Sequence, residues 1–184
     1  MATWNLERDG ISYSMLTKFL CCRERFRLYA LEGVTDYEGF QIALEYGNFF
    51  HAALENHDFT KDSFKDTFAA INREANKCRE KFPSALEEIY RWETICQKQF
   101  PIYVNRWESE DAGISYLFRE KVFRTPIELP NGKRVTMRGK WDGMLMKPDG
   151  SQQLLENKTK AYIDLDNLSH SLSYNLQTNW YLIA

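Results

Sequence analysis

The stretch GKWDGMLMKPDGSQQLLENKTK, residues 139–160, decides the fold that we expect for this chain. Apolar and polar residues alternate on both sides of Lys147-Pro148-Asp149-Gly150, a pattern typical of two β-strands joined as a hairpin. Proline at the second position and glycine at the fourth predict a type I turn closed by a left-handed glycine. Lys147 would then face Ser151 across a three-residue loop.

This turn sets which side chains meet farther along the hairpin. Counting back from the Lys147 and Ser151 pair places Asp142 opposite Glu156 on one face of the sheet. Lys158 points the same way because side chains alternate along a strand. Two neighbouring ionised carboxylates repel each other, so in a partly buried place one takes a proton or a cation neutralises both. A solvated salt-bridge cluster on an open sheet face is the alternative interpretation.

A third alternating segment, residues 114–129, ends at Leu129-Pro130-Asn131-Gly132 and completes a three-stranded antiparallel meander. If this turn is also a three-residue loop, Glu120 lies opposite Asp142 and extends the row of acids. A two-residue turn at Asn131-Gly132 would shift the register by one residue and remove Glu120 from the row. Oxygen ligands with at most one imidazole suit Mg²⁺ or Mn²⁺ better than zinc.

Helical periodicity dominates the rest of the chain. We expect a first helix from an N-cap at Ser14 to Gly33 and a second over residues 40–57, in which Gly47 and His51 share one face. Residues 60–110 predict a helical layer, broken at Pro83, where Ser84 and Glu87 would form a capping box, and again at Pro101. A last helix is expected from Leu168 onward.

Two groups of side chains in these helices have alternative interpretations. Trp92, Phe100, Tyr103 and Trp107 could form a binding stripe, but aromatic residues at helical spacing more often belong to the core. A lone histidine is more often a hydrogen-bonded core or surface residue than a metal ligand. His57 and His170 are therefore expected at the surface.

Composition limits the class of protein without naming its partners. The 184 residues, 43% of them hydrophobic, are enough for one buried core, and we expect a single domain over residues 1–184. The chain has 24 Lys and Arg against 26 Asp and Glu, so nucleic-acid affinity would need local patches. No signal-like or membrane-spanning stretch is present, which indicates a soluble, cytoplasmic protein. The four cysteines lack paired spacing and are expected to be reduced and mostly buried.

Five short motifs occur in one order between residues 12 and 181. They are Ser12-x-Ser14-x-Leu16-x-x-Phe19-x-x-Cys22-x-x-x-Phe26, Gly47-x-x-x-His51, Gly139-x-x-Asp142, Glu156-x-Lys158 and Gln177-x-x-x-Tyr181. Together they resemble the RecB-like branch of the PD-(D/E)XK nuclease superfamily, including the CRISPR-associated RecB-like exonucleases. A single E-x-K carries little information, whereas the shared order is specific. The resemblance implies an α/β fold with a restriction-endonuclease-like core and a helical insertion.

The resemblance also implies roles for individual residues. Positions matching His51, Asp142 and Glu156 bind one or two divalent ions, together with the backbone carbonyl of Asn157. Lys158 matches a residue that orients or activates the attacking water, and Gln177 one that supports this lysine and the site. Tyr181 matches a residue that contacts nucleic acid. From the residues alone, Arg23 and Arg27 share a helical face that contacts phosphate or is simply solvated.

Several relatives hold an iron-sulfur cluster, with one cysteine at the position of Cys22 and three more beyond the Gln-x-x-x-Tyr helix. This sequence stops at Ala184, and Cys78 and Cys96 fall in the helical layer. We therefore expect no cluster in this chain and leave open that the natural protein continues.

The expected activity is Mg²⁺- or Mn²⁺-dependent hydrolysis of DNA. By resemblance alone, it is an exonuclease acting on single strands or free ends in repair, recombination, or phage- or CRISPR-linked DNA processing, with a helicase or recombination partner. A catalytically idle nucleic-acid-binding or assembly subunit that keeps the fold is the alternative. An RNA-directed nuclease is a third, because no sequence feature here reads a 2′-hydroxyl.

Overall fold

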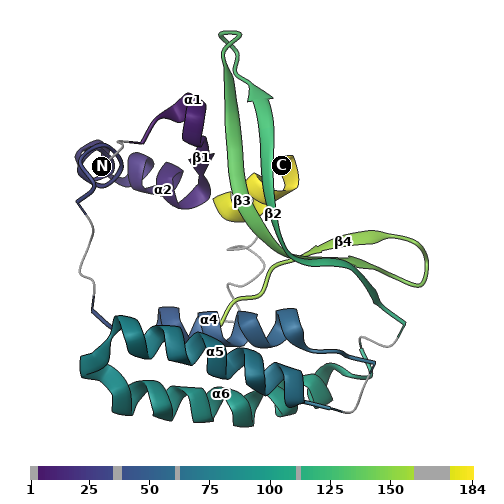
Figure 1. Cartoon of the computed structure of the whole chain (residues 1–184). Helices are drawn as coiled ribbons and strands as arrows, with labels where there is room; N and C mark the ends of the chain where they lie inside the picture. Colours follow the sequence, from purple (N-terminus) through teal and green to yellow (C-terminus); the bar gives the residue numbers. More distant parts are fainter. Residues whose placement is uncertain (1–3, 35–38, 61–62, 111–112, 160–174) are drawn as a thin grey trace.

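A long hairpin is the centre of the computed structural model, which describes residues 4–34, 39–60, 63–110, 113–159 and 175–184. Strands β2 (Ser115–Glu128) and β3 (Arg134–Met146) form this hairpin, and β4 (Gln152–Leu155) pairs antiparallel with the end of β3. The short β1 (Ile11–Ser12) runs parallel to β3, so the sheet is mixed (Figure 1). Helices flank it, and the expected α/β fold with an antiparallel meander is confirmed.

The turn between β3 and β4 has the predicted form. The Lys147 amide donates to the Ser151 carbonyl at 2.9 Å, and Gly150 has φ +82. Gly143 pairs with Leu155, the last residue of β4, so Glu156 follows directly and is level with Asp142.

The turn between β2 and β3 is also a three-residue loop, closed by the Leu129 amide donating to the Lys133 carbonyl at 2.8 Å. Lys121 pairs with Trp141 and Arg119 with Gly143, so Glu120 lies between them, level with Asp142. The two-residue alternative is excluded, and Glu120 stays in the row of acids.

The N-terminal helical region is more broken than the sequence pattern predicts. Helix α1 (Leu6–Asp9) precedes β1, and the expected first helix is divided into α2 (Tyr13–Cys21), α3 (Arg23–Phe26) and a π-helical turn, η1 (Arg27–Leu31). The N-cap is Ser12, not Ser14, because the Ser12 hydroxyl accepts a hydrogen bond from the Met15 amide. Cys22 interrupts the helix with an extended φ of −159.

A three-helix layer lies below the sheet in Figure 1 and is made of α4 (Ile42–Asn56), α5 (Lys65–Lys81) and α6 (Leu86–Trp107). A short 3₁₀ turn, η2 (Pro83–Ala85), confirms the break at Pro83, but the capping box of Ser84 and Glu87 does not form. The predicted break at Pro101 is wrong, since α6 continues through it. Phe100 is fully buried and Tyr103 packs on Phe50 of α4, and this packing offsets the hydrogen bond that proline cannot donate.

Two hydrophobic clusters hold the layers. The first fills the space between α4, α5 and α6, and its fully buried members are Phe49, Ala53, Ile71, Ala75, Ile89, Cys96 and Phe100. The second packs Phe123 and Met137 of the hairpin against Trp180 of α8 (Leu176–Ile183), whose N-cap is Asn175. The part of the last helix expected between Leu168 and residue 174 lies outside the described residues.

The aromatic residues of α6 belong mainly to the first cluster. Phe100 is in the core, and Trp92 and Tyr103 are half-buried against it, while Trp107 is exposed. The cysteine prediction is correct for Cys78 and Cys96 and wrong for Cys21 and Cys22, which are exposed.

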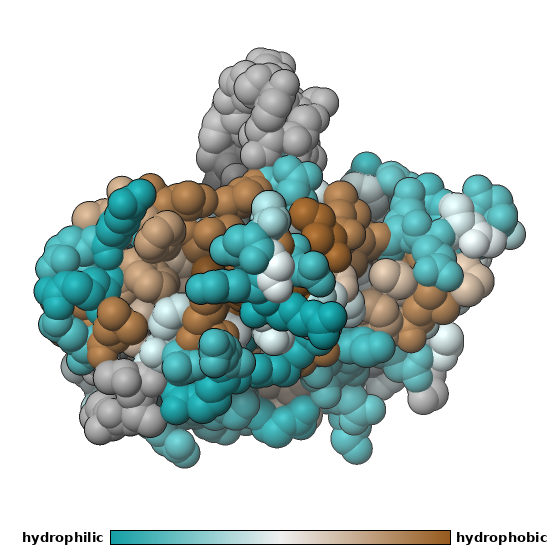
Figure 2. Space-filling model, turned by 90° about the horizontal axis from the view of Figure 1, so that it is seen from above, coloured by the Kyte–Doolittle hydropathy of each residue, from teal (hydrophilic) through white to brown (hydrophobic). Residues whose placement is uncertain are grey.

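Seen from above in Figure 2, apolar residues lie exposed among polar ones over the N-terminal helices at the left. In this N-terminal region, Phe19, Leu20, Leu31 and Val34 are exposed. None of the helices in the described part of the chain is both long and apolar enough to cross a bilayer.

Candidate active site

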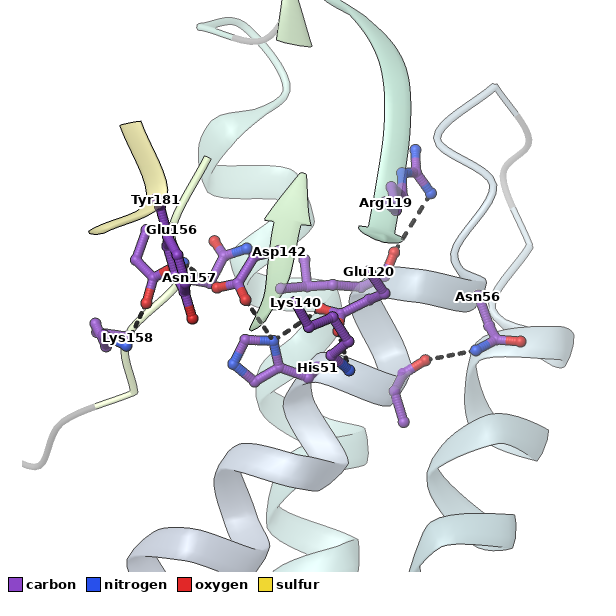
Figure 3. A network of polar contacts seen from close by, with 12 residues as sticks. His51, Asn56, Arg119, Glu120, Lys140, Asp142, Glu156, Asn157, Lys158 and Tyr181 are labelled. Atoms are coloured by element: carbon purple, nitrogen blue, oxygen red, sulfur yellow. Dashed lines mark hydrogen bonds and ion pairs between the residues drawn. The ribbon is translucent and has the colours of Figure 1, made fainter. Parts of the chain in front are cut away.

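Helix α4 directs His51 toward the sheet. Gly47 of this helix faces the chain that follows β4, and a Cβ there would lie 3.4 Å from the Thr159 hydroxyl oxygen, an ordinary van der Waals contact. His51 Nδ1 lies 3.0 Å from Glu120 Oε1 and 3.9 Å from Asp142 Oδ1. The helix and both long strands therefore meet at one imidazole (Figure 3).

Glu120 has an unusual backbone and a buried side chain. Its φ of +48 lies in the left-handed region, which costs about 1–2 kcal/mol for a residue other than glycine. The side chain is 3% exposed and contacts His51 through one oxygen and Lys140 through the other. Burial acts to raise the pKa of Glu120, but the hydrogen bonds from His51 and Lys140 outweigh it and lower the pKa.

Asp142 lies between two sets of partners. Its Oδ2 accepts a hydrogen bond of 2.6 Å from the Asn157 amide, while Oδ1 is turned toward His51. Burial raises the pKa of Asp142, against the opposing effects of the Asn157 amide and His51. The hydrogen bond from His51 to Glu120 raises the pKa of the imidazole. A bound cation would favour the ionised form of Asp142 and would replace the proton on the imidazole of His51.

Glu156 and Lys158 lie on the other side of Asp142 from His51 (Figure 3). Glu156 Oε1 contacts Lys158 and accepts a hydrogen bond of 2.7 Å from Gln177 Nε2. Gln177 also donates to the Tyr181 hydroxyl at 3.1 Å, so the two residues share a face of α8 as predicted. The observed partner of Gln177 is an acid of the site, and its support of Lys158 stays a prediction.

Three groups lie close enough together to serve as a donor set for a metal ion. His51, Glu120 and Asp142 each offer one ligand atom, and these atoms lie within 4.8 Å of one another. The three residues line a cavity of about 340 Å³ together with Tyr181. Glu156 lies outside this set. The observed contact of Asn157 is the hydrogen bond from its backbone N–H to Asp142, and not one through its carbonyl. Metal ligation by Glu156 and by the Asn157 carbonyl therefore stays a prediction.

Glu156 also has an unpaired oxygen. Its Oε2 is buried without a hydrogen-bond partner among the described residues. Burial raises the pKa of Glu156, and the neighbouring Lys158 opposes that shift. A hydrogen-bonded carboxylate with one buried oxygen unsatisfied is a suitable further cation ligand.

The two arginines predicted to contact phosphate lie apart from this cavity, in α3 and η1. Arg23 is exposed near the Phe19 ring, and Arg27 pairs with Glu24 and Glu32. Their role stays a prediction, and the two glutamates offset the charge of Arg27.

The sequence pattern predicted a surface position for His57, but this prediction is wrong because the side chain is buried. It is 3% exposed, its Nδ1 lies 3.0 Å from the Thr67 hydroxyl, and its ring stacks on Phe64. The tertiary packing of α4 against α5 buries it, which no local pattern signals. His170 lies outside the described residues.

Two residues of the site were missed by sequence reasoning. Lys140 pairs with Glu120, and its place two residues before Asp142 on an alternating strand could have indicated a shared face. Arg119 donates hydrogen bonds to the Leu54 carbonyl at 3.3 Å and the His57 carbonyl at 2.5 Å, at the end of α4. It fixes the helix that carries His51 to the strand that carries Glu120.

The fold and the site define a class of protein: a mixed sheet flanked by helices, in which an imidazole and carboxylates from three elements converge on one cavity. A family model of the PD-(D/E)XK nuclease superfamily matches residues 10–184, so the chain belongs to this superfamily. Its members are usually nucleases, which hydrolyse phosphodiester bonds, and they use divalent metals. A search of curated proteins found no match.

Proposed function

We propose that this protein is a divalent-metal-dependent deoxyribonuclease. The observation that carries the proposal is the convergence of His51, Glu120 and Asp142 on one cavity in a chain of a nuclease superfamily. One nitrogen and two carboxylate oxygens fit Mg²⁺ or Mn²⁺ better than zinc. The unpaired oxygen of Glu156 supports it as a further ligand of one or two ions.

The metal would supply two things when bound. It would lower the pKa of a bound water so that the water loses a proton and attacks near neutral pH, and it would place positive charge beside the phosphate. The chain supplies orientation and further charge. The hydrogen bond from the Asn157 backbone amide favours the ionised form of Asp142 against the effect of burial, and Gln177 holds the Glu156 carboxylate. Lys158 has a half-exposed side chain beside Glu156, so its ammonium group can position the attacking water and offset charge that develops on the phosphate. Tyr181 lines the same cavity, and we assign it a contact to the nucleic acid.

The finer assignment rests on the resemblance to the RecB-like branch. It comprises exonucleolytic action on single strands or free ends, in repair, recombination, or phage- or CRISPR-linked processing, with a helicase or recombination partner in the cytoplasm. Arg23 and Arg27 are proposed phosphate contacts at the exposed N-terminal helices.

The test is digestion of end-labelled single- and double-stranded DNA with Mg²⁺ or Mn²⁺, and with EDTA. Asp142→Asn keeps the size of the side chain and removes its charge, and we expect it to lower the rate at least about 10²-fold. Asp66→Asn, which removes an exposed acid in the first turn of α5, is the matched control and should cleave normally. Undiminished cleavage by Asp142→Asn would reject the site, and a labelled RNA strand tests substrate class in parallel.

Calorimetry with Mn²⁺ separates a nuclease from an idle scaffold. A nuclease binds the ion in a way that Asp142→Asn abolishes and Asp66→Asn does not. A chain that retains only the fold shows no such dependence.

A further inference from the structure

A second hollow adjoins the candidate metal centre. It has a volume of about 730 Å³ and lies between the N-terminal helices and the β2–β3 hairpin. Lys140 lines both hollows. The second also takes in Ser12 and Ser14 of the opening motif, which the proposed function leaves without a role.

The two hollows have opposite charge. Acids dominate the first, namely Glu55, Glu74, Glu120 and Asp142. Among the described residues, the second is lined by three cations, Arg124, Arg138 and Lys140, and by no carboxylate. One hollow suits a cation and the next suits an anion.

Strand register puts these cations in a row that leads away from the acids. Val122 pairs with Lys140 and Arg124 with Arg138, so the rungs follow the Glu120 and Asp142 rung at steps of two residues. Two residues along a strand span about 6.5–7 Å and return to the same face. The hairpin therefore presents the acids first, then Lys140, then the two arginines.

The arginines keep most of their capacity to bind phosphate. Arg124 donates to the Arg8 carbonyl at 3.1 Å, and Arg138 contacts the Met15 sulfur at 3.5 Å. Both partners are neutral, and a guanidinium has five N–H donors. Asp9 lies near enough for Arg138 to lower its pKa, but its carboxylate is bonded to Arg8.

Aromatic rings complete the wall of this hollow. Tyr29 of η1 is 37% exposed, and Trp4 is held in place by its indole N–H, which donates to the Gly10 carbonyl at 2.9 Å. Grooves for single-stranded nucleic acid combine a cationic track for the backbone with rings on which unpaired bases stack.

We propose that this groove binds single-stranded DNA on its way to the metal centre, with phosphates on Lys140, Arg138 and Arg124 and a base stacked on Tyr29. Charge changes along the hairpin from the acids of the metal centre to the arginines of the groove. Lys140 lines both cavities and so connects the groove to the metal centre. Its role in guiding the strand to cleavage rests on the proposed function, whereas the binding itself does not.

The test measures binding of a labelled short oligothymidylate to the full chain by fluorescence anisotropy in EDTA, across a salt series. The double variant Arg124→Ala with Arg138→Ala should bind at least about tenfold more weakly. The slope of log affinity against log salt should fall by about 1.4, since each phosphate contact contributes about 0.7 on a single strand. Tyr29→Ala should lower affinity about tenfold and leave the slope unchanged.

Three controls keep the result decisive. Arg91→Ala removes an exposed arginine from α6, in the far layer of Figure 1, and should bind as the parent protein does. Restoring the charge with Arg124→Lys and Arg138→Lys should recover most of the slope. Mn²⁺ calorimetry on every variant should be unchanged, which shows that the metal centre and the fold are intact.

The two proposals fail in different ways. Unchanged affinity and slope in the double arginine variant would overturn the groove, whether or not the protein cleaves DNA. Tighter binding of a duplex than of the single strand, with no effect of Tyr29→Ala, would also overturn it. A protein that binds single strands through these arginines but cleaves nothing in Mn²⁺ would overturn the proposed function and leave the groove standing.

Discussion

Glu120 shows how backbone strain and chemistry coincide at one residue. A glutamate at φ +48 persists only where its surroundings determine its position, and His51 and Lys140 each hold one of its oxygens. The strained backbone at Glu120, inside β2, takes this residue out of the regular ladder while its neighbours Arg119 and Lys121 stay paired. The strained backbone therefore occurs at the position where the side chain contacts His51.

At the same scale, Lys158 is expected to act on the rate of cleavage and not on metal affinity. Its ammonium group contacts Glu156 Oε1 and lies outside the His51, Glu120 and Asp142 set. Lys158→Met should lower kcat about 10²-fold while the Mn²⁺ affinity changes by no more than about threefold. Single-turnover cleavage and calorimetry measure the two quantities, with the exposed Lys98→Met as control. A large loss of Mn²⁺ affinity with an unchanged rate would contradict this role.

His57 predicts a pH dependence of stability. Burial lowers the pKa of this imidazole below its usual 6.5, and the nearby Arg119 adds to the shift. The unfolded chain therefore binds a proton that the folded chain resists, so the free energy of unfolding should fall as the pH drops below about 6.5. His57→Phe keeps an aromatic ring on Phe64 and removes the titration, which should flatten that slope.

Urea denaturation at a series of pH values between about 7 and 5 tests this, since both midpoint and slope are read directly. His51 titrates in the opposite sense because its pKa is raised, so it adds stability at low pH and loses it as the pH rises. His51 is present in both the parent protein and His57→Phe, so the difference between their pH profiles of unfolding free energy reports His57 alone. Identical pH profiles for the two proteins would show that His57 is not held neutral.

Among the elements, Arg119 joins α4 to β2. Its guanidinium donates to the carbonyls of Leu54 and His57 and lies over the ring of Tyr116, with 3.9 Å from the guanidinium carbon to the ring centroid. Arg119→Met keeps much of the length and removes the charged hydrogen bonds, which should cost about 2–4 kcal/mol of unfolding free energy. It should also weaken Mn²⁺ binding, because α4 carries His51. Arg106→Met on the exposed face of α6 should stay within about 0.5 kcal/mol of the parent in urea denaturation.

Features within one element or turn could be predicted from the sequence, whereas features that depend on contacts between elements could not. Turn chemistry is local, so Pro148-Asp149-Gly150 was enough to place Asp142 opposite Glu156. The turn at Pro130-Asn131-Gly132 left two registers open, and the backbone hydrogen bond between Leu129 and Lys133 decides for the one that keeps Glu120 in the row. The continuity of α6 through Pro101 and the burial of His57 depend on packing between helices, and no neighbouring residue signals them. The roles of Lys140 and Arg119 depend on which elements meet, and a single strand pattern leaves that open.

At the scale of the whole molecule, the candidate metal site lies between the two hydrophobic clusters. His51 belongs to the helical layer, while Glu120 and Asp142 belong to the hairpin, whose core faces α8. Arg119 links the helical layer to the hairpin through its hydrogen bond to the His57 carbonyl. A cation held by His51, Glu120 and Asp142 would add another link, and it would bind the folded chain in preference to the unfolded one.

Mn²⁺ should therefore raise the melting temperature of the whole protein. At a free concentration about 100 times the dissociation constant, the gain is about 2.7 kcal/mol, which corresponds to roughly 5–10 °C for a chain of this size. Differential scanning fluorimetry with Mn²⁺ and with EDTA measures the shift. Asp142→Asn removes a ligand from the hairpin and His51→Gln one from α4, and each should abolish most of it, while Asp66→Asn should keep it. A full shift in both ligand variants would place the ion elsewhere on the protein, because a site shared by the helical layer and the hairpin needs both.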